Sequence, residues 1–444
     1  MPSSYFHSLL ESIVERGRTV FDGTRDPGLS GRDLAGLAES LVGAPGEATG
    51  LVLAREILDL WEGLSPEGQA TFFRLLAERF GPREAALAEA VQAWRDAPGP
   101  ATARQVHEAS EPRRQELFRL LNRAPGGTPA LVAIRAALLD HLRANPDCAP
   151  DFSDVDADFQ HLFSSWFNRG FLVLRRIDWS TPAVILERII RYEAVHEING
   201  WDDLRRRIDP PDRRLYAFFH PALIDEPLIF VEVALTEAIP EGIAPILAEE
   251  REPLDPARAT VAVFYSISNC QKGLRGISFG NFLIKQVVEE LSRALPNLRT
   301  FATLSPVPGF RRWLEAGGAE AAGEAAQGAL ALLDNPGWPD DPQAVATLSP
   351  VLRGLTAEYL LCARAPNGQP RDPVARFHLG NGAHLERINV LGNPSPRGMA
   401  ESCGTMVNYV YDMKKIERNH EAYASRGTIA ATTAVRRLLP ASAR

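Results

Sequence analysis

Residues 264–314 read FYSISNCQKGLRGISFGNFLIKQVVEELSRALPNLRTFATLSPVPGFRRWL, and they contain the pattern that decides the fold. An apolar, β-branched run over 259–267 predicts a buried strand, and three-to-four spacing of apolar residues over 279–294 predicts an amphipathic helix. A second strand is expected over 298–304, ending at the segment Ser305-Pro306-Val307-Pro308-Gly309. The prolines fix the backbone there and prevent the strand from continuing.

Glycines occupy the connection between the first strand and the helix, at Gly273, Gly276 and Gly280. Glycine lets backbone N–H groups approach an anion, and the dipole of the following helix adds positive potential. The spacing is neither that of a P-loop nor that of a dinucleotide-binding G-x-G-x-x-G motif. A tight strand-to-helix turn is the plainer interpretation. The functional interpretation is a site for a phosphate-bearing ligand beside a serine.

The first 150 residues predict one helix after another, separated by proline–glycine pairs. The expected helices are 5–16, 30–42, 50–60, 66–79, 82–97, 102–121 and 128–144. Residues 145–156, NPDCAPDFSDVD, predict a polar linker. Beyond it, buried strands over 228–235 and 260–267, with a possible strand over 214–219, alternate with helices and indicate an α/β domain. A polar insertion is expected over 364–372 and a last helix over 428–438.

Composition is that of an ordinary globular protein, with 444 residues, 45% hydrophobic and 23% charged. The length suggests two domains. The formal net charge of −8 argues against a nucleic-acid partner. No apolar run is long enough to cross a membrane, and the N-terminus lacks the features of a signal peptide. We expect neither a metal site nor disulfides, because the four cysteines are scattered, and we expect Cys270 and Cys403 to be buried packing residues. Reduced thiols favour a cytoplasmic protein.

Four blocks between Gly273 and Tyr411 resemble malonyl-CoA decarboxylases, in the order in which that family has them. They are GLRGISFGNFLIKQVVEEL, TLSPVPGFRRWL, RFHLGNGAHLERIN and ESCGTMVNYVY. The tract over 163–212 is also similar, so the resemblance covers most of the chain beyond about residue 160. The strand–loop–helix–strand order itself resembles the coenzyme-A-binding unit of GNAT-type acetyltransferases. The spacing of Gln271, Gly273 and Gly276 differs from that group's usual signature.

The resemblance implies an N-terminal all-helical oligomerisation domain over 1–158, followed by a GNAT-like α/β catalytic domain with a mixed central sheet over 159–444. It implies a carboxy-lyase that converts malonyl-CoA to acetyl-CoA and CO2. No metal or organic cofactor is expected, because the thioester can accept the electron pair that decarboxylation releases. The implied partners are malonyl-CoA, acetyl-CoA and further copies of the chain in a dimer or tetramer.

The resemblance implies that Ser305 and His378 are catalytic, orienting the carboxylate and protonating the enolate. By themselves, Ser305 would be read as a helix cap and His378 as a core or strand histidine. Tyr411 is a candidate to donate a hydrogen bond to the carboxylate or to His378, with core packing as an equal alternative. His384 is expected to be structural.

The implied malonyl-CoA-binding residues follow the glycine pattern, and Ser305 and His378 complete them. They are Arg275, Gly276, Ile277, Ser278, Phe279, Gly280, Asn281 and Ile284. Some family members have an acidic residue where this chain has Ser278. Lys272, Arg275 and Lys285 are candidate partners for the phosphates, with a solvated surface charge as the alternative, favoured for Lys285.

Two other functions remain open at this point. A GNAT-type acyltransferase would transfer an acyl group to an amine without releasing CO2. A non-enzymatic acyl-CoA sensor would use the helical region as its output module. The presence of both Ser305 and His378 argues against a pure sensor.

Overall fold

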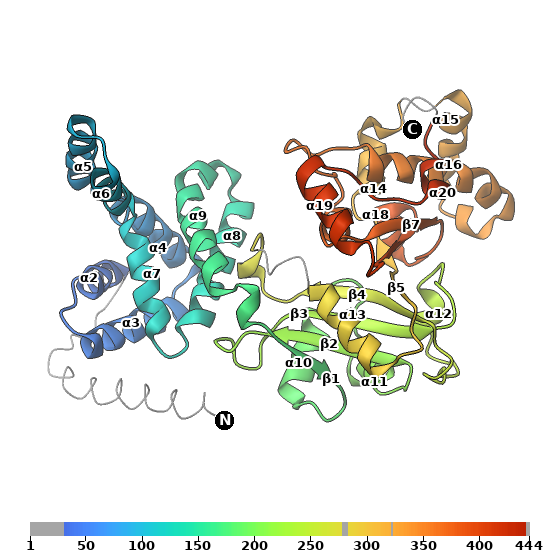
Figure 1. Cartoon of the computed structure of the whole chain (residues 1–444), viewed down its shortest axis with the longest axis horizontal. Coiled ribbons are helices and arrows are strands. Elements are labelled where there is room, and N and C mark those ends of the chain that lie inside the picture. Colours follow the sequence, from blue (N-terminus) through green and yellow to red (C-terminus); the bar gives the residue numbers. More distant parts are fainter. Residues whose placement is uncertain (1–30, 278–282, 321–322, 441–444) are drawn as a thin grey trace. The chain divides into compact units, whose positions relative to one another are not determined.

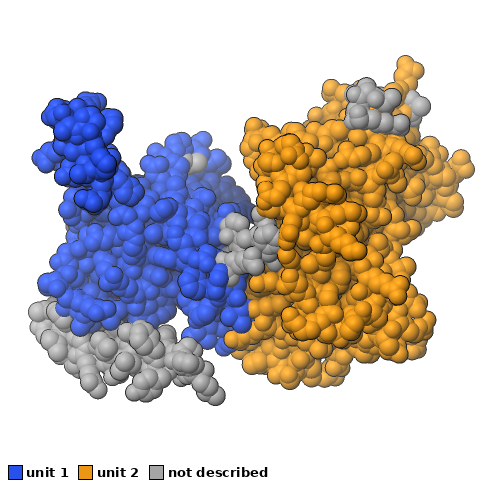
Figure 2. Space-filling model, in the orientation of Figure 1, with its two compact units in different colours: residues 1–173, 219–226, 271–279 blue, residues 174–218, 227–270, 280–444 orange. Residues whose placement is uncertain are grey.

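The computed structural model describes residues 31–277, 283–320 and 323–440. The chain divides into two compact units (Figure 2). Unit 1 comprises residues 1–173, 219–226 and 271–279, and unit 2 comprises residues 174–218, 227–270 and 280–444. The described part of the glycine segment, residues 271–277, therefore belongs to the helical unit, although it lies more than 100 residues beyond the helices in sequence. In the described part of the chain, no helix is long and apolar enough to cross a bilayer.

Unit 1 is built from amphipathic helices packed around aromatic side chains, with Trp61 against Phe72 and Phe73 and with Phe118 stacked on Phe159 at 4.1 Å. The helix α4 begins at a serine cap, because Ser65 accepts a hydrogen bond from the N–H of Gly68. The helices are α2 (Gly31–Val42), α3 (Glu47–Glu62), α4 (Pro66–Arg79), α5 (Glu84–Asp96), α6 (Pro100–Ser110), α7 (Arg113–Arg123), α8 (Gly127–Ala144) and α9 (Ala149–Trp166) (Figure 1). The predicted helix over 5–16 lies outside the described residues.

The predicted linker over 145–156 is wrong, because most of it is helical. Two prolines suggested a loop, yet Pro150 lies in the first turn of α9, where its missing N–H has no partner to lose. Phe152, Val155 and Phe159 then place a buried face toward the other helices. Helical spacing of apolar residues outweighs the polar composition of this segment.

The single helix predicted over 102–121 is two helices. α6 ends at Ser110 and α7 begins at Arg113. Glu111 has an extended backbone, with ψ of 123°, because the ring of Pro112 disfavours a helical conformation in the residue before it.

Unit 2 is organised around an eight-stranded sheet in the order β1-β2-β3-β4-β5-β8-β6, with β7 also pairing with β8. The strands are β1 (Val173–Ile177), β2 (Arg213–Phe219), β3 (Pro227–Thr236), β4 (Val261–Asn269), β5 (Thr300–Thr303), β6 (Ser305–Pro306), β7 (His384–Asn389) and β8 (Met406–Val410). The sheet is mixed, since β3 and β4 are antiparallel whereas β4 and β5 are parallel. A helical region followed by a mixed-sheet domain confirms the predicted fold class.

The helices of unit 2 are α10 (Ala183–Tyr192), α11 (Trp201–Ile208), α12 (Ala244–Leu247), α13 (Leu283–Ala294), α14 (Phe310–Trp313), α15 (Glu324–Leu330), α16 (Pro342–Leu361), α17 (Pro373–Gly380), α18 (Pro396–Ser402), α19 (Ile416–Arg426) and α20 (Thr433–Arg436). Figure 1 shows α10, α11, α12 and α13 beside strands β1–β5, whereas α14, α16, α18, α19 and α20 gather near β7. The last helix predicted over 428–438 is thus only the short α20, and the longer α19 precedes it.

The parallel strands β4 and β5 are joined through α13, as the opening pattern predicts. α13 buries Ile284, Val287, Val288 and Leu291 along one face, which is the amphipathic stripe of the sequence. The expected first turn of this helix, 279–282, lies outside the described residues. β4 and β5 pair only as far as Phe264 and Thr303, and the Leu304 N–H still reaches the Phe264 carbonyl at 3.0 Å.

Candidate active site

A cavity of about 230 Å³ opens where β4 and β5 separate. Beyond Phe264, β4 continues beside β3 as far as Asn269, whereas the chain after β5 pairs with β8, with Ser305 opposite Val407. Side chains from the separated strands and from α17 line the opening. Apolar groups dominate the lining, including Val195, Ile267 and Phe377.

Ser305 lies at the start of β6 and is 5% exposed. Its hydroxyl donates to Thr303 Oγ1 at 2.9 Å and lies 3.1 Å from His378 Nε2. Thr303 and Ser305 are two positions apart in an extended segment, so their side chains share one face. Thr303 was not singled out from the sequence, although this spacing from Ser305 could have indicated it.

His378 lies in the last turn of α17, not in a strand. The side chain of Asp372 caps this helix by accepting from the Ala375 N–H at 2.7 Å. Asp-Pro at positions 372 and 373 is a helix-start signature. It was overlooked in the sequence because Asp372 was assigned to the predicted polar insertion over 364–372. Burial lowers the pKa of His378 to about 3, so the imidazole is neutral in the free protein.

Tyr411 directly follows β8, and its backbone N–H donates to the Phe301 carbonyl at 2.9 Å. Its hydroxyl lies 2.8 Å from His378 Nδ1, and burial raises its pKa far above the ordinary value. The ring also meets Phe264 edge-on at 6.2 Å, so hydrogen bonding and core packing occur together. Tyr411 is thus near His378, as one of the two sequence interpretations expects.

Tyr411, His378, Ser305 and Thr303 form one continuous chain of hydrogen bonds. A neutral imidazole donates through one nitrogen and accepts through the other. Since Ser305 donates to Thr303, the consistent assignment has His378 Nε2–H donating to Ser305 and Tyr411 donating to Nδ1. The arrangement can therefore hold an anion or an oxygen atom at Ser305 and can move a proton through His378.

The described part of the glycine segment forms a short 3-10 turn from Lys272 to Leu274. It packs closely on α8, because a Cβ atom at Gly273 would lie 1.9 Å from the Val132 carbonyl oxygen. Gly276 has a φ of +82°, a conformation that favours glycine. Space around it is open, since the nearest atom to a Cβ there would be Gln160 Oε1 at 3.9 Å.

Arg135 on α8 holds this segment in place. Its guanidinium donates to the carbonyls of Gly273 at 2.7 Å and Arg275 at 2.9 Å, and it pairs with Asp156 of α9 at 2.8 Å. The Arg135 side chain is 1% exposed. Nothing in the sequence distinguished this arginine from the surface charges of the other helices.

Other predicted binding residues have mixed placements. Ile277 is buried and Arg275 is exposed. Ile284 lies in the first turn of α13, on the buried face of that helix. Ser278, Phe279, Gly280 and Asn281 lie outside the described residues. Their assignment to malonyl-CoA, together with that of the neighbouring residues, remains a prediction.

The charged candidates outside the cavity are engaged in surface ion pairs. Lys272 lies 3.7 Å from Asp140, and Lys285 lies 3.0 Å from Glu417. His384 is in β7 and bonds Glu386 at 2.9 Å. Cys270 and Cys403 are both buried. Within the described residues, no group of three His, Cys, Asp or Glu side chains could hold a metal ion.

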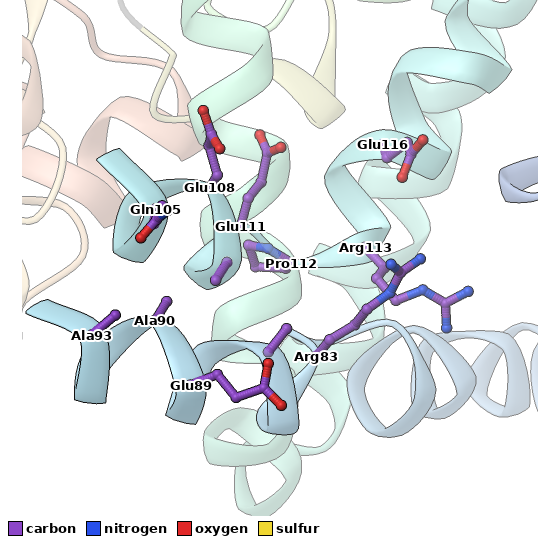
Figure 3. A pocket seen from close by; sticks show the side chains of 12 residues that line it. Arg83, Glu89, Ala90, Ala93, Gln105, Glu108, Glu111, Pro112, Arg113 and Glu116 are labelled. Carbon is purple, nitrogen blue, oxygen red and sulfur yellow. The ribbon is translucent and has the colours of Figure 1, made fainter. Parts of the chain in front are cut away.

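A larger pocket, of about 530 Å³, lies among α5, α6 and the start of α7 (Figure 3). Alanines form its apolar walls, and Figure 3 shows the carboxylates of Glu89, Glu108 and Glu111 around it. Its described lining contains no serine, cysteine or histidine, so we place the candidate chemistry in the smaller cavity of unit 2.

Comparison with known families and curated proteins gives a consistent result. Residues 170–444 match the malonyl-CoA decarboxylase C-terminal domain, and residues 80–167 match the malonyl-CoA decarboxylase N-terminal domain. The mitochondrial malonyl-CoA decarboxylase of Anser anser anser is 40% identical over 336 residues, which are 70% of this chain and 66% of the relative. That of Rattus norvegicus is 36% identical over 352 residues, covering 74% of this chain and 71% of the relative.

Solved structures agree with these matches. The malonyl-CoA decarboxylase from Rhodopseudomonas palustris is 55% identical, with a TM-score of 0.88, and covers 92% of this chain and 100% of its own. The one from Agrobacterium vitis is 53% identical, with a TM-score of 0.86, and covers 91% of this chain and 99% of its own.

Proposed function

The chain belongs to the malonyl-CoA decarboxylase family, and on this premise we propose that Ser305, His378 and Tyr411 carry out its conversion of malonyl-CoA to acetyl-CoA and CO2. The chain is accordingly an enzyme, a carboxy-lyase. The observation that supports these residue roles is the buried chain of hydrogen bonds from Tyr411 through His378 to Ser305 at the wall of the cavity.

Decarboxylation breaks the bond between the α-carbon and the carboxylate. The electron pair stays on the α-carbon and is delocalised into the thioester, giving an enolate, which then takes up one proton. Ser305 and His378 orient the carboxylate before the bond breaks, and preorganised donors stabilise the charge that develops on the thioester oxygen. The described lining of the cavity contains no charged side chain. Apart from its bonds to Ser305 and His378, a carboxylate in such an apolar site is poorly solvated, which favours its loss as CO2.

His378 supplies the proton. In the free protein it is neutral, because burial without an anionic partner disfavours the imidazolium. The malonyl carboxylate is such a partner, so its arrival raises the pKa of His378 and the imidazole takes up a proton. After CO2 leaves, this proton passes to the α-carbon. The Tyr411 hydroxyl can donate to Nδ1 or accept from it, and it stays bonded in both states.

Decarboxylation should proceed without a metal. We expect acetyl-CoA and CO2 to form in equal amounts from malonyl-CoA in a strong chelator, with no nucleotide added, because the thioester itself accepts the electron pair. A coupled assay for acetyl-CoA and a carbon dioxide electrode measure the two products. Loss of activity on chelation with recovery on adding a divalent ion would contradict the metal-free mechanism. Acyl transfer to an amine without CO2 would instead indicate an acyltransferase.

The glycine segment is proposed to hold the phosphates and pantetheine of the substrate. Its members are Arg275, Gly276 and Ile277, with Ser278, Phe279, Gly280, Asn281 and Ile284. The support is the positive φ of Gly276 and the firm seating of Gly273 on α8. The open surroundings of Gly276 leave the backbone there accessible to an anion without a side chain between them, and the packing of Gly273 on α8 fixes the position of the segment.

Replacing Gly276 with valine should weaken coenzyme A binding about tenfold while kcat changes less than twofold, because a β-branched residue resists positive φ and fills the space needed by the phosphates. Isothermal titration with coenzyme A measures the affinity. Gly368→Val is the matched control, since Gly368 has a φ of +77° and open surroundings in a turn outside the segment. Equal affinity for Gly276→Val and the wild type would move the phosphate site elsewhere.

We also propose that the chain is a homo-oligomer, that the helices before residue 159 mediate the association, and that the protein is cytoplasmic. Support for the first two comes from α5 and α6, which bury no residue of their own and expose Trp94 at 45%. Support for the third is that all four cysteines are free thiols. Light scattering on the full chain should show a dimer or tetramer at micromolar concentration, and a monomer there would contradict the proposal.

A further inference from the structure

We propose that Asp372 and Tyr409 form a buried positioning pair that holds the imidazole of His378 in line with Ser305. The proposal rests on the catalytic role assigned to His378, and it adds two residues that act through that histidine. The side chain of neither residue belongs to the hydrogen-bonded chain from Tyr411 to Thr303.

Asp372 determines where α17 begins. One carboxylate oxygen accepts from the Ala375 N–H at 2.7 Å, and the residue has no exposed surface. The other oxygen, Oδ2, is buried and has no hydrogen-bond partner among the described residues. A capping aspartate at a protein surface leaves its second oxygen to water, so a buried one requires a different partner.

Tyr409 contacts His378 directly and is linked to Ser305 through Thr303. Its ring stacks on the imidazole of His378, with centroids 4.7 Å apart and planes inclined by 25°. Its backbone N–H donates at 3.1 Å to Thr303 Oγ1, the atom that accepts from Ser305. A shift of Tyr409 would therefore disturb the imidazole and the serine together.

The Tyr409 hydroxyl is the natural partner for the second oxygen of Asp372. It too is buried and has no partner among the described residues. Burial is the main cause that raises the pKa of Tyr409, and the charge of Asp372 is the next, so the carboxylate lies in the neighbourhood of the hydroxyl. Burial, and after it the charge of Asp372, also raise the pKa of Tyr359, but the Tyr359 hydroxyl already bonds the Pro308 carbonyl at 3.4 Å.

A hydrogen bond from the Tyr409 hydroxyl to Asp372 Oδ2, direct or through one water, would satisfy both groups. Burial raises the pKa of Asp372 to about 7, and the pair can bond in either protonation state, since a protonated carboxyl can donate to the tyrosine oxygen. The bond would connect the start of α17 to the ring that stacks on His378 near its end. Helix and ring would then hold the imidazole from two directions.

Tyr409→Phe tests the pair because it keeps the stacked ring and removes only the hydroxyl. We expect kcat to fall about tenfold with the KM for malonyl-CoA within about twofold, since a lost positioning bond affects the transition state more than binding. Tyr423→Phe is the matched control. It removes another buried hydroxyl that has no partner among the described residues, from α19, which packs on α17, and should leave kcat unchanged.

Asp372→Asn keeps an oxygen for the cap, and Asp372→Ser is a second capping variant if the first folds poorly. Asp372→Ser has no second oxygen for the tyrosine, so it should lower kcat as Tyr409→Phe does, and the double variant of these two should be no slower than the slower single. Asp372→Asn keeps a group that can bond the tyrosine and should lower kcat less. Additive losses, an unchanged kcat in Tyr409→Phe, or an equal loss in Tyr423→Phe would overturn the pair.

A readout independent of turnover separates this proposal from the catalytic assignment. Imidazole nitrogen NMR of the free protein, with the His378 signals assigned by their absence in His378→Asn, should show a changed tautomer balance in Tyr409→Phe but not in Tyr423→Phe. Unchanged His378 signals in Tyr409→Phe would overturn the pair even if the protein decarboxylates malonyl-CoA. Changed signals in a protein without decarboxylase activity would support the pair while rejecting the proposed function.

Discussion

Replacing Ser305 with alanine should lower kcat for malonyl-CoA by roughly two to four orders of magnitude, and replacing His378 with alanine or asparagine should have an effect of similar size. Ser305 places a hydroxyl at the cavity, and His378 holds the proton that the enolate needs. Each variant should retain the fold, because the Ser305 change removes a single oxygen and asparagine preserves polarity at position 378. Steady-state kinetics with malonyl-CoA measures kcat, and circular dichroism shows whether the fold is retained.

The double variant should be little slower than the slower single variant, since the two side chains share a hydrogen bond of 3.1 Å and act as a unit. Tyr411→Phe, which removes only the partner of Nδ1, should lower kcat less, by about tenfold.

Two variants serve as controls for these losses. Ser402→Ala removes a buried hydroxyl that bonds only backbone carbonyls, and His384→Asn alters a histidine paired with Glu386. Near wild-type turnover in Ser305→Ala or His378→Asn would reject that residue.

Local patterns in the sequence were sufficient to predict the strand and the helix next to the site. The β-branched run and the amphipathic run around the glycines correspond to β4 and α13, because burial on one face is decided by the spacing of nearby residues. Where a proline was involved, its position within the element mattered more than its presence. Pro150 begins α9, whereas Pro112 separates α6 from α7.

The chemistry of the site depends on contacts that no local pattern contains. Ser305 and His378 are 73 positions apart, and only a resemblance to known sequences brought them together. Tyr409 and Tyr411 are both buried near His378, yet one stacks on the ring and the other bonds its nitrogen. Alternation along a strand distinguishes neighbours but not which of several tertiary partners a side chain meets. Thr303 and Asp372 did have local signals, the two-residue spacing from Ser305 and the Asp-Pro helix start, but neither signal indicates that His378 lies nearby.

Arg135→Met should destabilise unit 1 by about 3–5 kcal/mol, the range typical of removing one partner from a buried ion pair. The guanidinium bonds Asp156 and the carbonyls of Gly273 and Arg275, and methionine fills similar space without replacing any of these bonds. Thermal unfolding of unit 1 should show a lower midpoint, by about 2–4 °C for each kcal/mol in a unit of this size. Arg143→Met is the matched control on the same helix, because Arg143 is 60% exposed and its pair with Asp140 should contribute less than about 1 kcal/mol.

The same variant should weaken coenzyme A binding if the glycine segment holds the phosphates, because the carbonyls of Gly273 and Arg275 are held to α8 by this side chain. Isothermal titration at a temperature well below the unfolding midpoint separates lost affinity from lost fold. The coenzyme A affinity and the unfolding midpoint of Arg135→Lys should fall between those of the wild type and Arg135→Met. One ammonium can reach some of the three acceptors but lacks the fork of the guanidinium. A midpoint for Arg135→Met equal to that of Arg143→Met would show that the buried contacts contribute little. If the midpoint of Arg135→Met is the lower of the two, the helices before residue 150 stabilise the proposed substrate-binding segment directly. A chain beginning at residue 151 would then lose this stabilisation together with any self-association.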